Sequence, residues 1–143
     1  MITLRGEARE VALAEVQAVH ALAGDGKYAD LVGEVDAGEV EDVATLESVL
    51  ELGLQTGRIR ALYGPGGEQA ATSTLRRLPR GVERSESAAG VSTALQALVG
   101  RTLDGVTLSA VGPGAFTLSI DAGGLETSIR LDRNGARLAS VGT

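Results

Sequence analysis

In the first hundred residues, apolar side chains recur every three or four positions, which is the pattern of amphipathic helices. Residues 7–23 show it first, with Val11, Val16 and Val19 on one face, and Gly24 and Gly26 end the segment. The same spacing predicts a helix over residues 41–55, which Thr56-Gly57 breaks. Helices are also predicted for residues 67–78 and 88–99 and a short one for residues 28–32, and the apolar pattern continues from Ile59 to Gly64.

The connections between these helices are predicted from glycine, proline and polar residues. Residues 33–39 have the composition of a turn, and Gly64-Pro65-Gly66-Gly67 that of a loop. Pro79 and Gly81 are expected to end the helix that begins at residue 67. Residues 80–86 are therefore the predicted linker.

From Gly105 onward the period changes to two, the signature of half-buried strands. Strands are predicted for residues 106–111, 115–121, 125–132 and 136–141. The turns between them contain Gly112-Pro113-Gly114, Gly123-Gly124 and Asn134-Gly135, and Asn-Gly is the strongest short hairpin signal. Three successive hairpins give a meander with one apolar face, and the nearest element to cover it is the helix at residues 88–99.

The predicted fold class is therefore α+β, with four to five N-terminal helices followed by a C-terminal four-stranded antiparallel meander packed on a helix. Residues 1–80 form a mainly helical region, and residues 81–143 form a helix plus the meander. We expect either one compact domain or two closely packed subdomains, because 143 residues suffice for one core.

Composition narrows the function classes. The chain has no cysteine, so it forms no disulfide and has no thiolate nucleophile, which suits a cytoplasmic location. No apolar stretch reaches the length of a membrane span, and the N-terminus lacks the pattern of a signal peptide. The aromatic residues are Tyr28, Tyr63 and Phe116 only, which disfavours single-stranded nucleic acid, a ligand usually bound by aromatic stacking.

Charge is distributed unevenly along the chain. The net charge is −6, but residues 1–55 hold 12 acidic and 3 basic side chains, and residues 56–101 hold 3 acidic and 7 basic. Two copies could therefore meet acidic end to basic middle. The alternative is that the two regions compensate each other as solvated faces of one domain. The acidic total disfavours nucleic acid as a partner.

A binding site is predicted around the glycine-rich loop at residues 64–67. Gly66 and Gly67 precede a predicted helix, whose bare backbone amides suit an anion, and Tyr63 lies beside them as an anchor for a partner. The alternatives are a plain helix connector and a tyrosine packed on the core. The densest basic patch, suited to an acidic protein partner, comprises Arg76, Arg77, Arg80 and Arg84.

Catalytic and metal chemistry find little support in the sequence. His20 is the only histidine, it falls on the polar face of its predicted helix, and no nucleophile-bearing turn accompanies it. One histidine without cysteine gives no zinc site. The acidic residues between Asp36 and Asp42 lack the spacing of a calcium loop and fit the start of an acidic helix. We predict no cofactor, no metal and no catalytic residue, although a pair of buried carboxylates would change the last of these.

The leading hypothesis is a non-enzymatic cytoplasmic protein that acts through protein–protein contacts, as an accessory subunit, a chaperone-like factor or a homo-oligomer. Its partner is another protein or a second copy, and neither nucleic acid nor membrane. The rival hypothesis is that the chain is a small-molecule-binding α+β domain, or an enzyme, with an apolar pocket between the sheet and the helices. A cavity lined by tyrosine or arginine beside a buried carboxylate would favour the rival.

Overall fold

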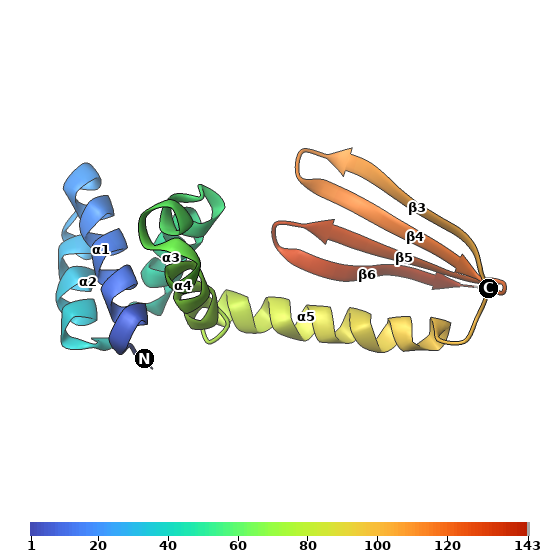
Figure 1. The fold of residues 1–143 in the computed structure, drawn as a ribbon, viewed down its shortest axis with the longest axis horizontal. Coiled ribbons are helices and arrows are strands. Elements are labelled where there is room, and N and C mark those ends of the chain that lie inside the picture. Colours follow the sequence, from blue (N-terminus) through green and yellow to red (C-terminus); the bar gives the residue numbers. More distant parts are fainter. Residues whose placement is uncertain (143) are drawn as a thin grey trace. The chain divides into compact units, whose positions relative to one another are not determined.

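The computed structural model describes residues 1–142, and it confirms the predicted α+β class (Figure 1). The helices are α1 (Gly6–Ala23), α2 (Gly26–Ala37), α3 (Val43–Gln55), α4 (Arg58–Leu75) and α5 (Pro79–Leu95), followed by a 3₁₀ turn (Gln96–Leu98). The strands are β1 (Ile2–Thr3), β2 (Glu39–Val40), β3 (Leu103–Gly112), β4 (Ala115–Ala122), β5 (Leu125–Asp132) and β6 (Gly135–Gly142). No helix within residues 1–142 is long and apolar enough to cross a membrane.

The chain divides into two units, Met1–Val82 and Glu83–Thr143, so α5 begins in the first and continues in the second. The first unit is helical and holds the main apolar core, to which α1, α2, α3 and α4 all contribute. The short strands β1 and β2 pair in antiparallel fashion, and they contribute Ile2 and Val40, which face each other, to this core. The core includes the fully buried side chains of Leu4, Val16, Leu31, Val35, Leu46, Leu50 and Ile59.

The turn predicted for residues 33–39 is wrong, because α2 continues to Ala37. Two features stabilise the longer helix. The side chain of Asp25 accepts a hydrogen bond from the Lys27 backbone amide at its start, and Leu31 and Val35 are buried one turn apart. Gly38 ends it in the left-handed conformation, at φ 85°, with its amide donating to Glu34 and Val35 carbonyls.

The linker predicted for residues 80–86 is also wrong, because these residues form the first turns of α5. Pro79 stands at the first helical position, where a missing N–H costs no hydrogen bond. The loop predicted at residues 64–67 is reduced to a kink: Gly64 is non-helical, at φ 70° and ψ −171°, and the helix resumes at Pro65. Helix α4 therefore consists of two helical segments that meet at this kink.

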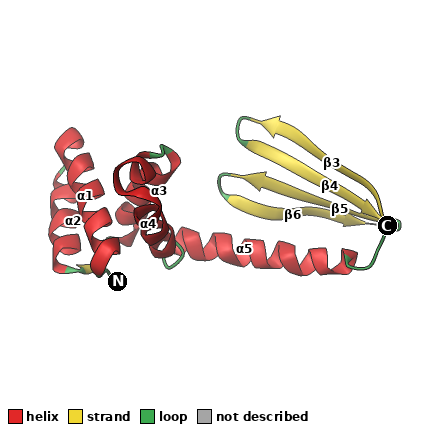
Figure 2. Ribbon diagram, viewed as in Figure 1, coloured by secondary structure: helices red, strands yellow, loops and turns green. Residues whose placement is uncertain are grey.

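The second unit is built on a four-stranded antiparallel sheet in the order β3-β4-β5-β6 (Figure 2). Residues that face each other across antiparallel strands share one side of the sheet. The register gives three apolar rows of four residues. These rows are Val106-Ile120-Thr127-Val141, Leu108-Leu118-Ile129-Leu138 and Ala110-Phe116-Leu131-Ala136.

Candidate functional site

The apolar face formed by these three rows is only partly covered within the chain. Thr127 and Ile129 on β5 are buried, whereas Val106 and Leu108 on β3 have exposed fractions of 54% and 61%. Three further side chains at the margins of the face are also exposed: Phe116, Leu138 and Val141. Ser87, Gly90 and Val91 of α5 line a shallow cleft together with residues 136–138 of β6. The chain therefore leaves much of an uncharged sheet face in contact with water.

The opposite face has polar side chains in its central rows. Thr107, Ser119, Ser128 and Ser140 form a row of hydroxyls across the four strands, and the Ser119 and Ser128 oxygens lie 3.4 Å apart. A neighbouring row contains Arg130 and Arg137. The contrast between the two faces means that only the apolar one gains from burial against another surface.

Strand β3 also leaves an edge open. In the described chain it pairs with β4 alone, and all ten of its residues are exposed. Its sequence carries one charged residue, Asp104, and neither lysine nor proline. Natural edge strands are often protected by such residues, which β3 lacks, and the pairing of β3 with β4 is irregular only at Leu103–Gly105 and Ala110–Gly112.

In the helical unit, a buried carboxylate is paired with an arginine from 43 residues away. Glu15 on α1 is 3% exposed, and both of its oxygens accept from Nε of Arg58 on α4, at 3.1 and 3.2 Å. Tyr63, also on α4, lies next to this pair. Burial raises the pKa of Tyr63, the charge of Glu15 and a hydrogen bond with it raise this pKa further, and Arg58 partly opposes the shift.

An apolar cleft opens beside this ion pair. Its volume is about 180 Å³, and it lies between α1 and α3. The apolar walls come from Ala18, Val19, Leu22, Val49 and Leu52, and Glu15 and Arg58 form the polar end. The sequence hypothesis placed a pocket between sheet and helices, whereas this one lies wholly among the helices of the first unit.

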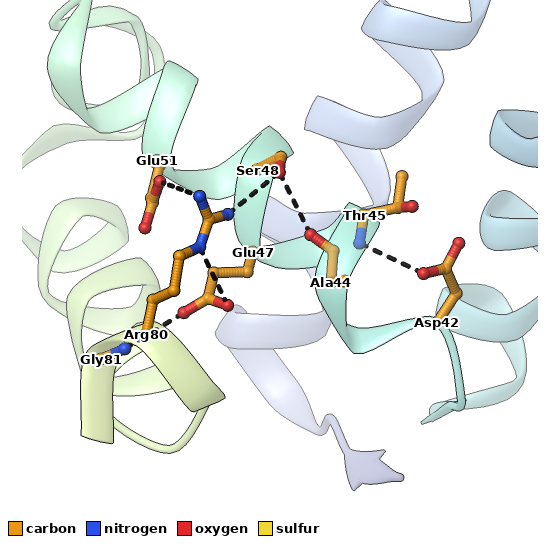
Figure 3. A network of polar contacts seen from close by, with 8 residues as sticks. All are labelled: Asp42, Ala44, Thr45, Glu47, Ser48, Glu51, Arg80 and Gly81. Carbon is orange, nitrogen blue, oxygen red and sulfur yellow. Dashed lines mark hydrogen bonds and ion pairs between the residues drawn. The ribbon is translucent and has the colours of Figure 1, made fainter. Parts of the chain in front are cut away.

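A second buried glutamate anchors the start of α5 (Figure 3). Glu47 on α3 accepts from the backbone amide of Gly81 at 3.1 Å through one oxygen and pairs with Nε of Arg80 at 3.3 Å through the other. Arg80 also contacts Glu51 at 3.3 Å and donates to the Ser48 hydroxyl at 3.0 Å. Because Gly81 lies in the first turn of α5, Glu47 satisfies an amide that the helix itself leaves unpaired.

The residues predicted to form a binding site around residues 64–67 pack closely against other side chains of the helical unit. A Cβ on Gly67 would lie 2.3 Å from Cβ of Tyr63, so this glycine lets the two turns of the bent helix approach. A Cβ on Gly66 would lie 3.2 Å from a carboxylate oxygen of Glu7, which places a negative charge where an anion was expected. Tyr63 is partly buried against the helical core.

The four arginines of the predicted basic patch have different surroundings. The charge of Arg80 is engaged by Glu47 and Glu51, and Arg77 reaches the carbonyl of Thr3 at 3.5 Å. Arg76 is exposed at the end of α4. Arg84 belongs to the second unit, where its side chain lies beside Gly135.

Sequence reasoning missed Glu15 and Glu47 as structural carboxylates. A signal was present for Glu15, because it is flanked by Val11, Ala12, Val16 and Val19 on the apolar side of its helix. His20, predicted to face solvent, is partly buried, and its Nδ1 has no hydrogen-bond partner within residues 1–142. Only the three-dimensional arrangement shows which arginine satisfies each glutamate.

Comparison with known proteins adds no assignment to this geometry. No protein-family model, no curated protein and no solved structure matches the chain.

Proposed function

We propose that this protein is a non-enzymatic cytoplasmic protein that works by protein–protein contact, and that its sheet unit associates with a second copy of the chain. The observation that carries the proposal is the uncovered apolar face, with Val106 and Leu108 more than half exposed on β3. A face of this kind gains free energy when it is removed from water, and exposed patches of this type mark interaction sites.

A second copy fits this face because the three apolar rows contain no charged residue. Two such faces meet without burying an unpaired charge, which would be costly. A two-fold arrangement places the same patch on both subunits, and an uncharged apolar patch is complementary to itself. The exposed residues Val106 and Leu108 belong to the edge strand β3, whose free backbone edge carries almost no charge. Pairing along this edge is a second way in which another copy could bind.

The test compares neighbouring residues on opposite faces of β3 in the full-length chain. Analytical ultracentrifugation at several concentrations should show a reversible dimer for the wild type. Leu108→Asp should sediment as a monomer, because it places a charge in the contact. Thr107→Asp is the matched control, since it adds the same charge one residue away on the polar face, and it should remain dimeric.

Salt separates this contact from an electrostatic one. Apolar association should persist as salt rises, whereas docking of the acidic N-terminal region on the basic middle should weaken. A wild type that stays monomeric up to about 100 μM, well above a micromolar dissociation constant, would overturn the proposal. Equal dissociation by Thr107→Asp and Leu108→Asp would also overturn it, because the apolar face would then have no special role.

A further inference from the structure

The cleft between α1 and α3 offers a small molecule apolar walls and a polar end that contains Glu15 and Arg58. Its volume of about 180 Å³ exceeds that of an apolar cavity of about 150 Å³ known to hold benzene. Leu22 on α1 and Leu52 on α3 are both largely exposed on its walls. These side chains gain from contact with an apolar ligand, because the folded chain leaves them in water.

The polar end of the cleft determines the chemistry of the ligand. Glu15 is 3% exposed and is engaged by Arg58, so its carboxylate is shielded from an incoming molecule. The side chain of Arg58 is 47% exposed, and it holds Glu15 through Nε. The Nη1 and Nη2 groups are not used by Glu15, although the guanidinium also has a hydrogen bond with the Tyr63 side chain. A guanidinium has five N–H donors, so one held by Glu15 and Tyr63 keeps further donors for a second carboxylate.

We propose that this cleft binds a small carboxylic acid with an apolar chain or ring, whose carboxylate pairs with Arg58 while its apolar part lies against Leu22 and Leu52. Glu15 acts as a positioning residue, because it orients the guanidinium and neutralises part of its charge. Tyr63 supports the same pair from the next turn of α4. The site lies within the helical unit and does not depend on association through the sheet.

The experiment titrates octanoate into the full-length protein, with octylammonium as a probe of equal length and opposite charge. Calorimetry and amide chemical shifts of Ala18, Leu22 and Leu52 report binding. Octanoate should bind saturably, and octylammonium should bind at least about tenfold more weakly, because a cation meets Arg58 rather than the shielded Glu15. Equal affinity for the two probes would overturn the assignment of the carboxylate to Arg58.

Two variants separate the cleft from general adsorption. Ala18→Leu fills the cleft and should abolish octanoate binding, whereas Ala21→Leu adds the same volume at an exposed position of α1 outside the cleft and should leave it unchanged. Arg58→Lys keeps the charge but loses the fork, and should weaken octanoate about tenfold. The proposal fails if octanoate shows no saturable effect up to about 10 mM, or if Ala21→Leu weakens binding as much as Ala18→Leu.

Discussion

Nε of Arg58 donates to both carboxylate oxygens of Glu15, although the two residues stand 43 positions apart in the chain. The two partners differ in environment, since the glutamate is almost fully buried and the arginine side chain is about half exposed. Removing one partner is therefore not equivalent to removing the other. The loss of Arg58 leaves a buried charge unpaired, whereas the loss of Glu15 leaves a cation that water can solvate.

Arg58→Met should lower the free energy of unfolding by about 3 kcal/mol, because an uncompensated buried carboxylate is strongly destabilising. Glu15→Gln should cost less, about 1 to 2 kcal/mol, and the double variant should be more stable than Arg58→Met alone. Urea denaturation followed by circular dichroism gives these values. The matched control is Arg60→Met, which removes an exposed pair with Glu68 on the same helix and should change stability by less than about 0.5 kcal/mol. Similar losses for Arg58→Met and Arg60→Met would contradict the buried role of the first pair.

Tyr63 should make the protein less stable in alkali. Its pKa in the folded chain is raised above its unfolded value of about 10, through burial and the proximity of Glu15. The neutral phenol is favoured by folding, so its contribution is fully present below pH of about 10 and is lost as the pH rises through the folded pKa. In a Tyr28→Phe background, tyrosinate absorbance should titrate at higher pH in the folded protein than in urea.

The control for this titration is Tyr63→Phe, which should remove much of the fall in stability above pH of about 10. Glu15→Gln should move the titration of Tyr63 to lower pH, because it removes the negative charge beside the phenol. An unchanged titration in Glu15→Gln would show that the carboxylate does not influence Tyr63.

Glu47→Ala should loosen the start of α5. It removes the acceptor of the Gly81 amide and one partner of Arg80, while Glu51 still pairs with that arginine. A buried amide without an acceptor costs about 1 to 3 kcal/mol, so we expect a loss of that size together with faster hydrogen exchange at Gly81. Ser48→Ala serves for comparison, since it removes only two exposed hydrogen bonds, one accepted from Arg80 and one donated to the Ala44 carbonyl. Unchanged exchange at Gly81 in Glu47→Ala would rule out this capping role.

The sheet was predictable because its determinants are local. Alternation from Val106 onward gives the two faces, and Gly123-Gly124 and Asn134-Gly135 set the hairpins that bring the rows into register. The expectation that the apolar face needs cover also came from this pattern. How far that cover extends depends on the position of α5, which alternation along the strands does not encode.

The helical errors have a common cause in contacts distant along the chain. Gly81 reads as a helix breaker in isolation, yet its amide is satisfied by Glu47 from α3. Residues 33–37 remain helical because Val35 is buried in the core. In both segments tertiary packing overrides a weak local preference.

The candidate site was only partly accessible from the sequence. Tyr63 was identified, with two interpretations, and the structure places it beside Glu15 and Arg58 rather than at an open loop. Glu15 was missed because burial of an acidic residue on an apolar helix face is plausible only once its cationic partner is known. That partner, Arg58, is separated from it by two helices along the chain.

The two glycines of α5 should respond in opposite directions to replacement by alanine. A Cβ on Gly81 would lie 1.7 Å from the carbonyl oxygen of Leu75 and 2.6 Å from its carbon, and backbone atoms cannot rotate away. Gly81→Ala should therefore destabilise the protein by about 3 kcal/mol, through overpacking.

At Gly90 an added Cβ meets nothing within 4 Å, so Gly90→Ala should stabilise the chain by about 0.5 to 1 kcal/mol, because alanine loses less backbone entropy in a helix. Urea denaturation of both variants, with the slope of the transition checked for constancy, measures the two effects. The pair is informative because both substitutions add one methyl group to the same helix. Equal stability of Gly81→Ala and Gly90→Ala would contradict the close contact between Gly81 and the Leu75 carbonyl. It would also contradict the backbone position that brings the Gly81 amide to Glu47.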